Sequence, residues 1–214
     1  MSESATPSND DDQYARANEK SRKRKEARDK ILATKTLEKG LLMVHTGKGK
    51  GKSTAAFGLV VRALGNGMRV GVVQYVKGKW QTGERHVLER FGDQATIRTM
   101  GEGFTWETQD KARDIRAAER AWEVSKEMIE ACRGDDPAYD LLLFDELNIV
   151  LRYDYLPLEE VVATLAARPP NLHIIVTGRN AKDPLIEAAD LVTEMTMVKH
   201  HFKDGVKAQK GIEF

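Results

Sequence analysis

The feature that most constrains this chain is a glycine-rich turn between an apolar run and a helical pattern, in the stretch LLMVHTGKGKGKSTAAFGLVVRAL (41–64). Glycines let the backbone take positive φ and curl around oxygen atoms without Cβ clashes. The exposed backbone N–H groups and the start of the following helix then present hydrogen-bond donors and partial positive charge to an anion. The stretch therefore predicts a phosphate-binding loop rather than a surface turn without a ligand.

Residues of this loop have separate predicted roles. Lys52 is expected to reach terminal phosphate oxygens, and the Ser53 hydroxyl is expected to ligate Mg²⁺. Lys48, Lys50 and Lys52 bring three like charges together, which favours a polyphosphate such as that of Mg·ATP as the ligand. The predicted nucleotide-binding set is Thr46, Gly47, Lys48, Gly49, Lys50, Gly51, Lys52, Ser53 and Thr54.

The loop departs from the usual spacing G-x-x-x-x-G-K-[ST]. Counting back from Gly51 puts Thr46 where the first glycine belongs, and reading from Gly47 gives a loop one residue shorter. The way in which the loop holds each phosphate stays open at this point.

The remainder of the chain alternates short apolar runs with longer amphipathic stretches. Such alternation predicts an α/β fold of the phosphate-loop, RecA-like type: a mostly parallel six-stranded sheet with helices on both faces and ligands at the carboxyl ends of the strands. Asp110 is the expected N-cap of the longest helix of this part, and Gly134 its stop. The expected strands are 41–46, 70–76, 95–100, 140–146, 172–178 and 191–197, and the expected helices are 52–64, 110–133 and 158–167.

A second acidic site follows the buried-strand pattern DLLLFDELNIV (140–150). In phosphate-loop proteins a carboxylate at this strand end holds Mg²⁺, so Asp145 and Glu146 are predicted metal-site residues. Asp145 could equally cap the next helix, and spacing does not decide which carboxylate dominates. Arg179 and Asn180 follow another strand and are expected to contact the nucleotide.

Residues 1–39 form a charged extension, and residues 40–214 form the predicted phosphate-loop domain. We expect 1–12 to be disordered and 13–34 to form a helix only against a partner. The basic cluster of this extension fits a nucleic-acid arm or a solvated helix face, and interspersed Glu26 and Asp29 favour the solvated face.

Composition limits the class of protein. The net charge of +1 gives no whole-chain attraction to nucleic acid or membrane, and no run has the length of a membrane span. The acidic start lacks the apolar stretch of a secretory signal. Cys132 stands alone, which excludes an internal disulfide framework and a multi-cysteine zinc site. We therefore expect a cytoplasmic protein without nucleic-acid or membrane partners.

Several stretches together resemble the ATP:corrinoid adenosyltransferase family, also called cob(I)alamin adenosyltransferases of the phosphate-loop type. The resemblance covers about 41–214, and it is specific because glycine–aromatic stretches and a KAQKGIEF ending are not general features of nucleotide enzymes. The stretches are TGKGKGKST (46–54), VQYVKGKWQTGE (73–84), MGEGFTWETQD (100–110), LFDELNIVLRYDYL (143–156) and the C-terminal run 173–214.

The resemblance implies transfer of the 5′-deoxyadenosyl group from ATP to the cobalt(I) of a corrinoid (cobyrinate a,c-diamide, cobinamide or cobalamin), with release of triphosphate. It also implies Lys52, Phe104 and Trp106 as catalytic residues, the two aromatic rings lying on the lower face of the corrin and excluding its axial base. The alternative for these rings is that they anchor a loop on the core. A homodimer, in which the N-terminal helix closes over a neighbour's corrinoid, and a reductase as electron donor are implied partners.

Further residues have predicted positions, and two further functions compete with adenosyl transfer. An ordinary ATPase or kinase and a non-enzymatic nucleotide switch are the competing functions. We expect core or edge positions for His45 and His173, a structural position for Cys132, and no metal partner for His200 and His201. Residues that follow the second strand and are expected to approach ATP or corrinoid are Lys77, Trp80 and Glu84.

Overall fold

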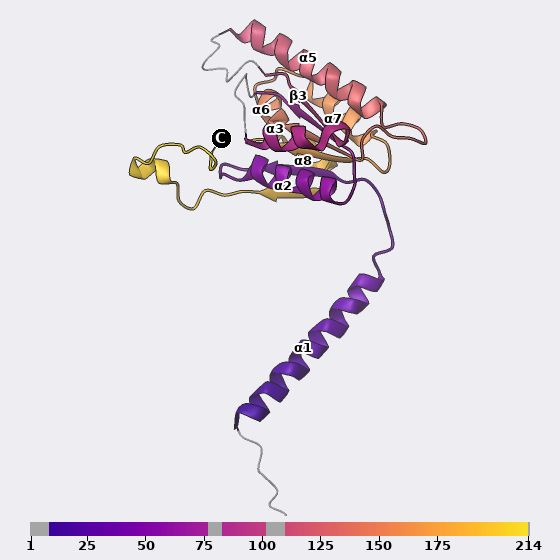
Figure 1. Ribbon diagram of the computed structural model, residues 1–214, viewed down its shortest axis with the longest axis vertical. Coiled ribbons are helices and arrows are strands. Elements are labelled where there is room, and N and C mark those ends of the chain that lie inside the picture. The colour runs from indigo at the N-terminus through magenta and orange to yellow at the C-terminus, as the bar shows by residue number, and fades with distance from the viewer. Residues whose placement is uncertain (1–8, 77–82, 102–109, 214) are drawn as a thin grey trace, which may run out of the picture. The chain divides into compact units, whose positions relative to one another are not determined.

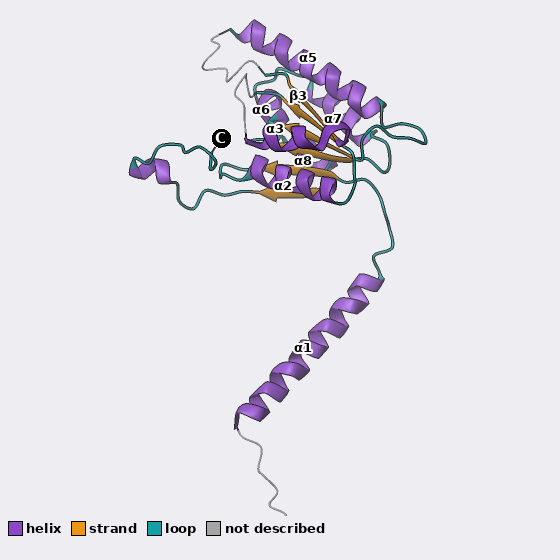
Figure 2. Cartoon of the chain, in the orientation of Figure 1, coloured by secondary structure: helices purple, strands orange, loops and turns teal. Residues whose placement is uncertain are grey.

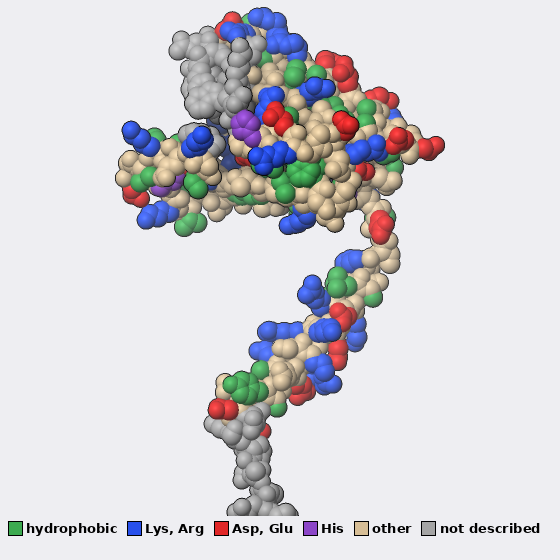
Figure 3. Space-filling model, viewed as in Figure 1, with side chains coloured by type: hydrophobic (Ala, Val, Ile, Leu, Met, Phe, Trp, Pro, Cys, Tyr) green, Lys and Arg blue, Asp and Glu red, His purple; other side chains and the backbone are tan. Residues whose placement is uncertain are grey.

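The computed structural model describes residues 9–76, 83–101 and 110–213, in two compact units, Met1–Glu38 and Lys39–Phe214. The first unit contains helix α1 (Asn9–Ala33), along which lysine and arginine side chains predominate, with acidic ones among them (Figure 3). The expectation of disorder through residue 12 was wrong for residues 9–12, because the helix begins at Asn9. Asp10 and Asp12 lie in the first turn, where negative charge stabilises a helix.

The second unit is built on a six-stranded sheet (Figure 2). All five pairings between neighbouring strands are parallel, and the order across the sheet is β3-β2-β4-β5-β1-β6. The predicted α/β fold with a parallel six-stranded sheet is confirmed. The strands are β1 (Leu42–Thr46), β2 (Val70–Gln74), β3 (Ala95–Thr99), β4 (Leu141–Asp145), β5 (His173–Thr177) and β6 (Leu191–Glu194).

Alternating strand residues supply two hydrophobic cores, one on each face of the sheet. Phe144 packs in the core that contains Trp122, whereas its neighbour Leu143 packs in the core that contains Phe57. The first core is covered by α5 (Lys111–Glu130), α6 (Leu147–Arg152), α7 (Leu158–Ala166) and α8 (Asp183–Ala188). The second is covered by α2 (Lys52–Gly65) and α3 (Gly83–Leu88), so helices lie on both faces (Figure 1).

Residues that begin and end the longest helix of the sheet unit were predicted from the sequence. Asp110 precedes α5 and its side chain accepts a hydrogen bond from the Arg113 N–H at 3.0 Å, which confirms it as the N-cap. The other end differs from the prediction, because α5 ends at Glu130 with Ala131 as its C-cap residue, before the predicted stop at Gly134. Gly134 has a φ of 90°, a conformation that suits glycine, in the turn that follows. Short helical segments that were not predicted are α3, α6, α8, η1 (Glu89–Gln94) and η2 (His201–Asp204).

Charged side chains fasten the beginning of β1 to the beginning of β6. The Asp190 carboxylate accepts hydrogen bonds from the Leu42 N–H and from Arg168, each at 2.8 Å, and pairs with Lys39. Arg168 also donates to the Gly40 carbonyl at 2.8 Å. This cluster holds the amino ends of two neighbouring strands together, away from the phosphate loop.

Asp190→Asn should lower the free energy of unfolding by about 1 kcal/mol near neutral pH, because a charge-assisted, partly screened pair is lost. The hydrogen bond from Lys39, followed by that from the Leu42 N–H, holds the pKa of Asp190 below its usual range. The stabilisation that the Asp190 carboxylate gives to the folded state is therefore present above the unfolded-state pKa of Asp190. It is lost as pH falls through the lower folded-state pKa. Urea unfolding of the wild type and the variant at neutral pH and at about pH 3 tests this, with exposed Asp93→Asn as the control. A difference that persists undiminished at the lower pH would contradict it.

Candidate functional site

The carboxyl edge of the sheet carries a row of polar side chains. Four neighbouring strands end on a buried polar residue, namely Gln74, Asp145, Thr177 and Thr46. Thr177 donates to the Asp145 carboxylate at 2.8 Å, and the Gln74 amide lies 3.5 Å from the other carboxylate oxygen. Thr99, at the end of β3, donates to the side-chain amide oxygen of Gln74 at 3.0 Å. The row therefore joins four strands through side chains at the edge where ligands bind in such sheets.

The phosphate loop lies at the same edge, between β1 and α2. Gly47 and Gly51 have φ values of 99° and 102°, which only glycine adopts without strain. A Cβ at Gly47 would lie 2.4 Å from the Met195 carbonyl oxygen. The Gly49 N–H donates to that same carbonyl at 2.7 Å, so the chain that follows β6 runs directly along the loop.

The loop lysines differ in their surroundings. Lys52 is half-buried and its ammonium donates to the Gly49 carbonyl, across the loop. Burial lowers the pKa of Lys52, the nearby cation of Arg179 lowers it further, and the carboxylate of Glu146 raises it. Lys48 is exposed, whereas Lys50 pairs with the Glu213 carboxylate. The fold thus brings Lys52, Arg179 and Glu146 within electrostatic reach of one another.

The remaining loop residues have distinct positions. Ser53, in the first turn of α2, is half-buried, and Thr54 is exposed. The Thr46 hydroxyl accepts a hydrogen bond from the Ala181 N–H at 3.0 Å, which braces the loop that follows β5. Ser53 and Thr54 are thus the hydroxyl residues at the start of α2, and Ser53 is the less exposed of the two.

The two carboxylates after β4 have different roles in the fold. Glu146 is the N-cap residue of α6, with a φ of 67° and no side-chain cap hydrogen bond, and its N–H donates to the Thr177 hydroxyl at 2.9 Å. Asp145 is fully buried and lies one residue earlier. The alternative that Asp145 caps the next helix is therefore wrong.

Arg179 and Asn180 follow β5 in a tight turn. Gly178 has a φ of 132°, and a Cβ there would lie 2.8 Å from the Asn148 side chain. Asn148, which is almost completely buried in α6, donates to the Gly178 carbonyl at 3.2 Å. Asn180 has a φ of 55° and is exposed, as is Arg179. Contact between α6 and this turn sets the direction in which Arg179 leaves the sheet.

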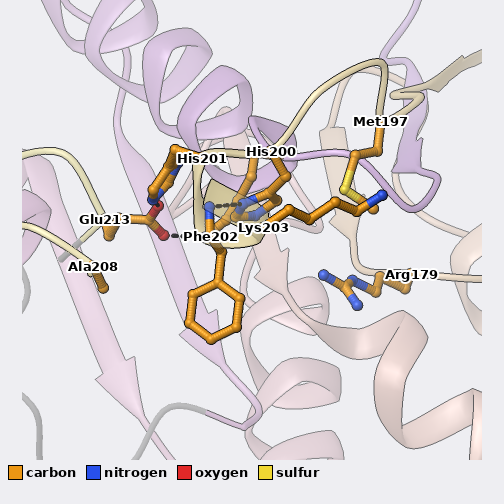
Figure 4. Close-up of a pocket in the computed structure, with 9 residues that line it drawn as sticks. Arg179, Met197, His200, His201, Phe202, Lys203, Ala208 and Glu213 are labelled. Atoms are coloured by element: carbon orange, nitrogen blue, oxygen red, sulfur yellow. Dashed lines mark hydrogen bonds and ion pairs between the residues drawn. The ribbon is translucent and has the colours of Figure 1, made fainter. Parts of the chain in front are cut away.

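A cavity of about 370 Å³ opens between the loop and the C-terminal segment (Figure 4). Its lining includes the cations of Lys50 and Arg179 and the apolar side chains of Met197 and Phe202. Glu213 closes one side, where its carboxylate lies 3.2 Å from the His201 imidazole. The cavity combines positive charge with apolar surface, a composition that suits a charged organic ligand.

The histidines and the cysteine that were predicted to be structural lie in buried or hydrogen-bonded positions. His45 is buried, with its Nδ1 3.3 Å from the Lys52 carbonyl, and His173 accepts from the Leu41 N–H at 3.1 Å, as expected of satisfied histidines. Cys132 is buried in the core as expected. Glu84 is half-buried on α3. Predicted residues that lie outside the described ones are Lys77, Trp80, Phe104 and Trp106.

The described residues lack two kinds of feature, a multi-residue metal-binding cluster and a membrane-spanning helix. In the ranges that the structure describes, no cluster of three or more histidine, cysteine, aspartate or glutamate residues forms a metal-binding group. No helix among the same residues is both long and apolar enough to cross a membrane.

Site residues that were not predicted include Gln74, Thr177, Asn148 and Glu213. For Gln74 and Thr177 a signal was present, because each ends an otherwise apolar strand pattern. A polar residue that ends a buried strand at the carboxyl edge of a parallel sheet is itself a pointer to a binding site. Glu213 had no such signal, because it lies in the tail, far from the loop along the chain.

Comparisons with known proteins agree with this geometry. The sequence profile of the family described as ATP:corrinoid adenosyltransferase BtuR/CobO/CobP matches residues 38–214. A corrinoid adenosyltransferase of Sinorhizobium sp. is 54% identical over 210 residues, which are 97% of this chain and 95% of the relative. Proteins of the same description from Pseudomonas aeruginosa and Salmonella typhimurium are 51% and 44% identical, over 93% and 95% of this chain and 96% and 99% of theirs.

Among solved structures, the RadB recombinase aligns with a TM-score of 0.44 at 15% identity, over 76% of this chain and 77% of that protein. The family profile spans nearly all of the unit that contains the phosphate loop, the acidic strand end and the C-terminal segment. This chain therefore belongs to the ATP:corrinoid adenosyltransferase family.

Proposed function

We propose that this chain transfers the 5′-deoxyadenosyl group from ATP to the cobalt(I) of a corrinoid, with release of triphosphate, as a step in adenosylcobalamin formation. The observation that carries the proposal is the family match over 38–214, a range that contains the whole carboxyl edge of the sheet. Within that range the half-buried Lys52, the cation of Arg179 and the buried Asp145 all lie at the same edge.

The proposed reaction requires the protein to stabilise negative charge, and it requires no nucleophile from the protein. The cobalt(I) of the substrate supplies an electron pair to C5′, the cobalt–carbon bond forms, and the C5′–O bond breaks with its electron pair going to triphosphate. Negative charge therefore builds on the leaving oxygen. In this proposal Lys52 and Arg179 offset that charge, a contribution on the order of several kcal/mol. The remaining task of the chain is to hold the two substrates in line.

A magnesium ion fits the residues at this edge. The Ser53 hydroxyl and the Asp145 carboxylate are oxygen donors, which Mg²⁺ prefers. Thr177 and Gln74 hold the Asp145 carboxylate in a fixed orientation, as supporting residues do in metal sites. Bound Mg²⁺ would supply further neutralisation of the phosphate oxygens. Glu146 is the second carboxylate of the proposed metal site.

The direct test incubates the purified chain with ATP, Mg²⁺ and chemically reduced corrinoid. We expect the absorbance change of cobalt–carbon bond formation and one triphosphate for each adenosylated corrinoid. ADP and phosphate as the products would instead identify an ATPase or kinase. Nucleotide binding without turnover of any corrinoid would favour a nucleotide switch. A comparison across cobyrinate a,c-diamide, cobinamide and cobalamin would then identify the preferred substrate.

The aromatic residues Phe104 and Trp106 are proposed to lie against the lower face of the corrin. Replacing both by alanine should spare transfer to pre-reduced cobalt(I) but impair transfer when cobalt(II) must be reduced on the enzyme. The reason is that rings which exclude the axial base make cobalt(II) four-coordinate and easier to reduce. Rates measured with strong and with mild reductant check this. Equal losses in both assays would contradict the role.

The partners follow from the same family membership and are also proposals. They are a second copy of this chain, whose α1 closes over the neighbouring corrinoid, and a reductase that delivers electrons to cobalt, in the cytoplasm. Sedimentation of the full chain, with and without residues 1–38, tests the dimer and the part that α1 plays in it.

A further inference from the structure

The phosphate loop already holds an anion that belongs to the chain itself. Lys50 pairs with the carboxylate of Glu213, 163 positions further along the sequence. The other oxygen of that carboxylate lies 3.2 Å from the His201 imidazole (Figure 4). The Glu213 side chain is only 12% exposed although it lies in the tail. One carboxylate thus occupies the position where a loop lysine would otherwise meet phosphate.

The C-terminal segment, residues 195–213, touches the loop at both of its ends. At its beginning the Met195 carbonyl accepts from the Gly49 N–H at 2.7 Å, and the Met195 N–H donates to Thr46 at 2.9 Å. At its end Glu213 returns to Lys50. Both ends of the segment therefore lie against the phosphate loop, and residues 195–213 are called the C-terminal strap below.

Little apolar burial holds this segment in place beyond Met195. The side chains of Val198, Phe202 and Ile212 are 96%, 72% and 80% exposed. The hydrogen bond from Lys50 holds the pKa of Glu213 below its usual range, so the carboxylate is charged at neutral pH. Attachment of this end therefore depends strongly on one ion pair, whereas backbone hydrogen bonds fix the beginning.

We infer that Glu213 is an internal anion that occupies Lys50 until a polyphosphate displaces it, so that nucleotide binding releases the C-terminal end from the phosphate loop. The inference rests on the proposed function, because it takes the loop as the polyphosphate site. A triphosphate carries several charges and also reaches Lys52 and the loop N–H groups, so it outcompetes a single carboxylate for Lys50. With triphosphate bound, Glu213 would face like charge at close range.

Calorimetry with inorganic tripolyphosphate tests the competition. Glu213→Gln keeps the shape of the side chain but removes its charge, so tripolyphosphate should bind roughly fivefold tighter than to the wild type. Glu187→Gln, an exposed glutamate on α8, is the matched control and should leave the affinity unchanged. Equal or weaker binding by Glu213→Gln overturns the inference, and weaker binding would show that Glu213 helps to hold the ligand.

A spin label at the end of the strap tests the release. Ile212→Cys gives a selective attachment point, because Cys132 is the only native cysteine and is buried. The label should be restrained in the ligand-free chain, and either tripolyphosphate or the added Glu213→Gln change should make it mobile. A label that stays equally restrained in all three states overturns the inference.

The two measurements separate the possible failures. If the wild type binds tripolyphosphate but neither affinity nor label mobility depends on Glu213, the displacement is refuted and the proposed function stands. If the wild type does not bind tripolyphosphate at all, the proposed function is refuted and the displacement with it.

Discussion

Replacing Lys52 by alanine is expected to lower kcat/KM for ATP by on the order of a thousandfold, while the chain remains folded. Lys52 is half-buried and its ammonium reaches across the loop to the Gly49 carbonyl, so it is held at the loop where we propose that the terminal phosphates bind. Its removal deletes a cation that offsets charge on the leaving triphosphate. Initial rates at several ATP concentrations, with pre-reduced corrinoid, measure the effect.

Two controls accompany this variant. Lys35→Ala removes an exposed lysine outside the phosphate loop and should leave kcat/KM unchanged. Thermal unfolding of Lys52→Ala should resemble that of the wild type, because the half-buried ammonium of Lys52 is repelled by the nearby cation of Arg179 when no ligand is bound. A variant that unfolds normally and retains wild-type kcat/KM would remove Lys52 from the proposed mechanism.

Asp145→Asn is expected to lower kcat/KM by on the order of a hundredfold or more and to raise the Mg²⁺ concentration needed for activity. The asparagine retains an oxygen that can accept the hydrogen bond from Thr177, so the fold should lose little. The charge that would attract the metal is gone. Activity measured across a Mg²⁺ titration, alongside urea unfolding, separates the two effects.

Glu146→Gln, measured in parallel, determines which carboxylate dominates. Glu146 is the N-cap residue of α6 and is less buried than Asp145, so its variant should show the smaller change in Mg²⁺ requirement. Asp93→Asn serves as the control for charge removal at the surface. An unchanged Mg²⁺ dependence in Asp145→Asn would contradict a metal role for that residue.

Most of the fold could be predicted from the sequence because its strands and its two longest sheet-covering helices have clear hydrophobic patterns. Strands β1, β2, β4 and β5 are short runs rich in apolar residues, and α2 and α5 repeat apolar residues at helical spacing. Helices α3, α6 and α8 have six residues each, fewer than two turns, so no periodicity shows in their sequences. Strand β6 is three residues shorter than predicted, because the chain leaves the sheet at Met195 to follow the phosphate loop.

Candidate site residues could be predicted from the sequence where they lie together in one short stretch. The loop glycines, Lys52 and Ser53 are neighbours in the sequence, so a phosphate loop can be predicted from them without knowledge of the tertiary structure. Gln74 and Thr177 join Asp145 only because β2 and β5 lie on either side of β4. Sequence order does not reveal that arrangement. The approach of Glu213 to Lys50 depends on the path of the whole C-terminal segment, which no local pattern determines.

The hydrogen bond from the Gly49 N–H to the Met195 carbonyl leaves this loop one fewer backbone amide for phosphate. Long, mobile lysine side chains must then supply a larger share of the attraction than they would in a loop whose amides all face the ligand. Attraction between exposed ammonium groups and phosphate is screened by dissolved ions, with a Debye length of about 8 Å at physiological ionic strength. Affinity for nucleotide in this chain should accordingly fall steeply as salt is added, so that measurements made in different buffers are comparable only at matched ionic strength.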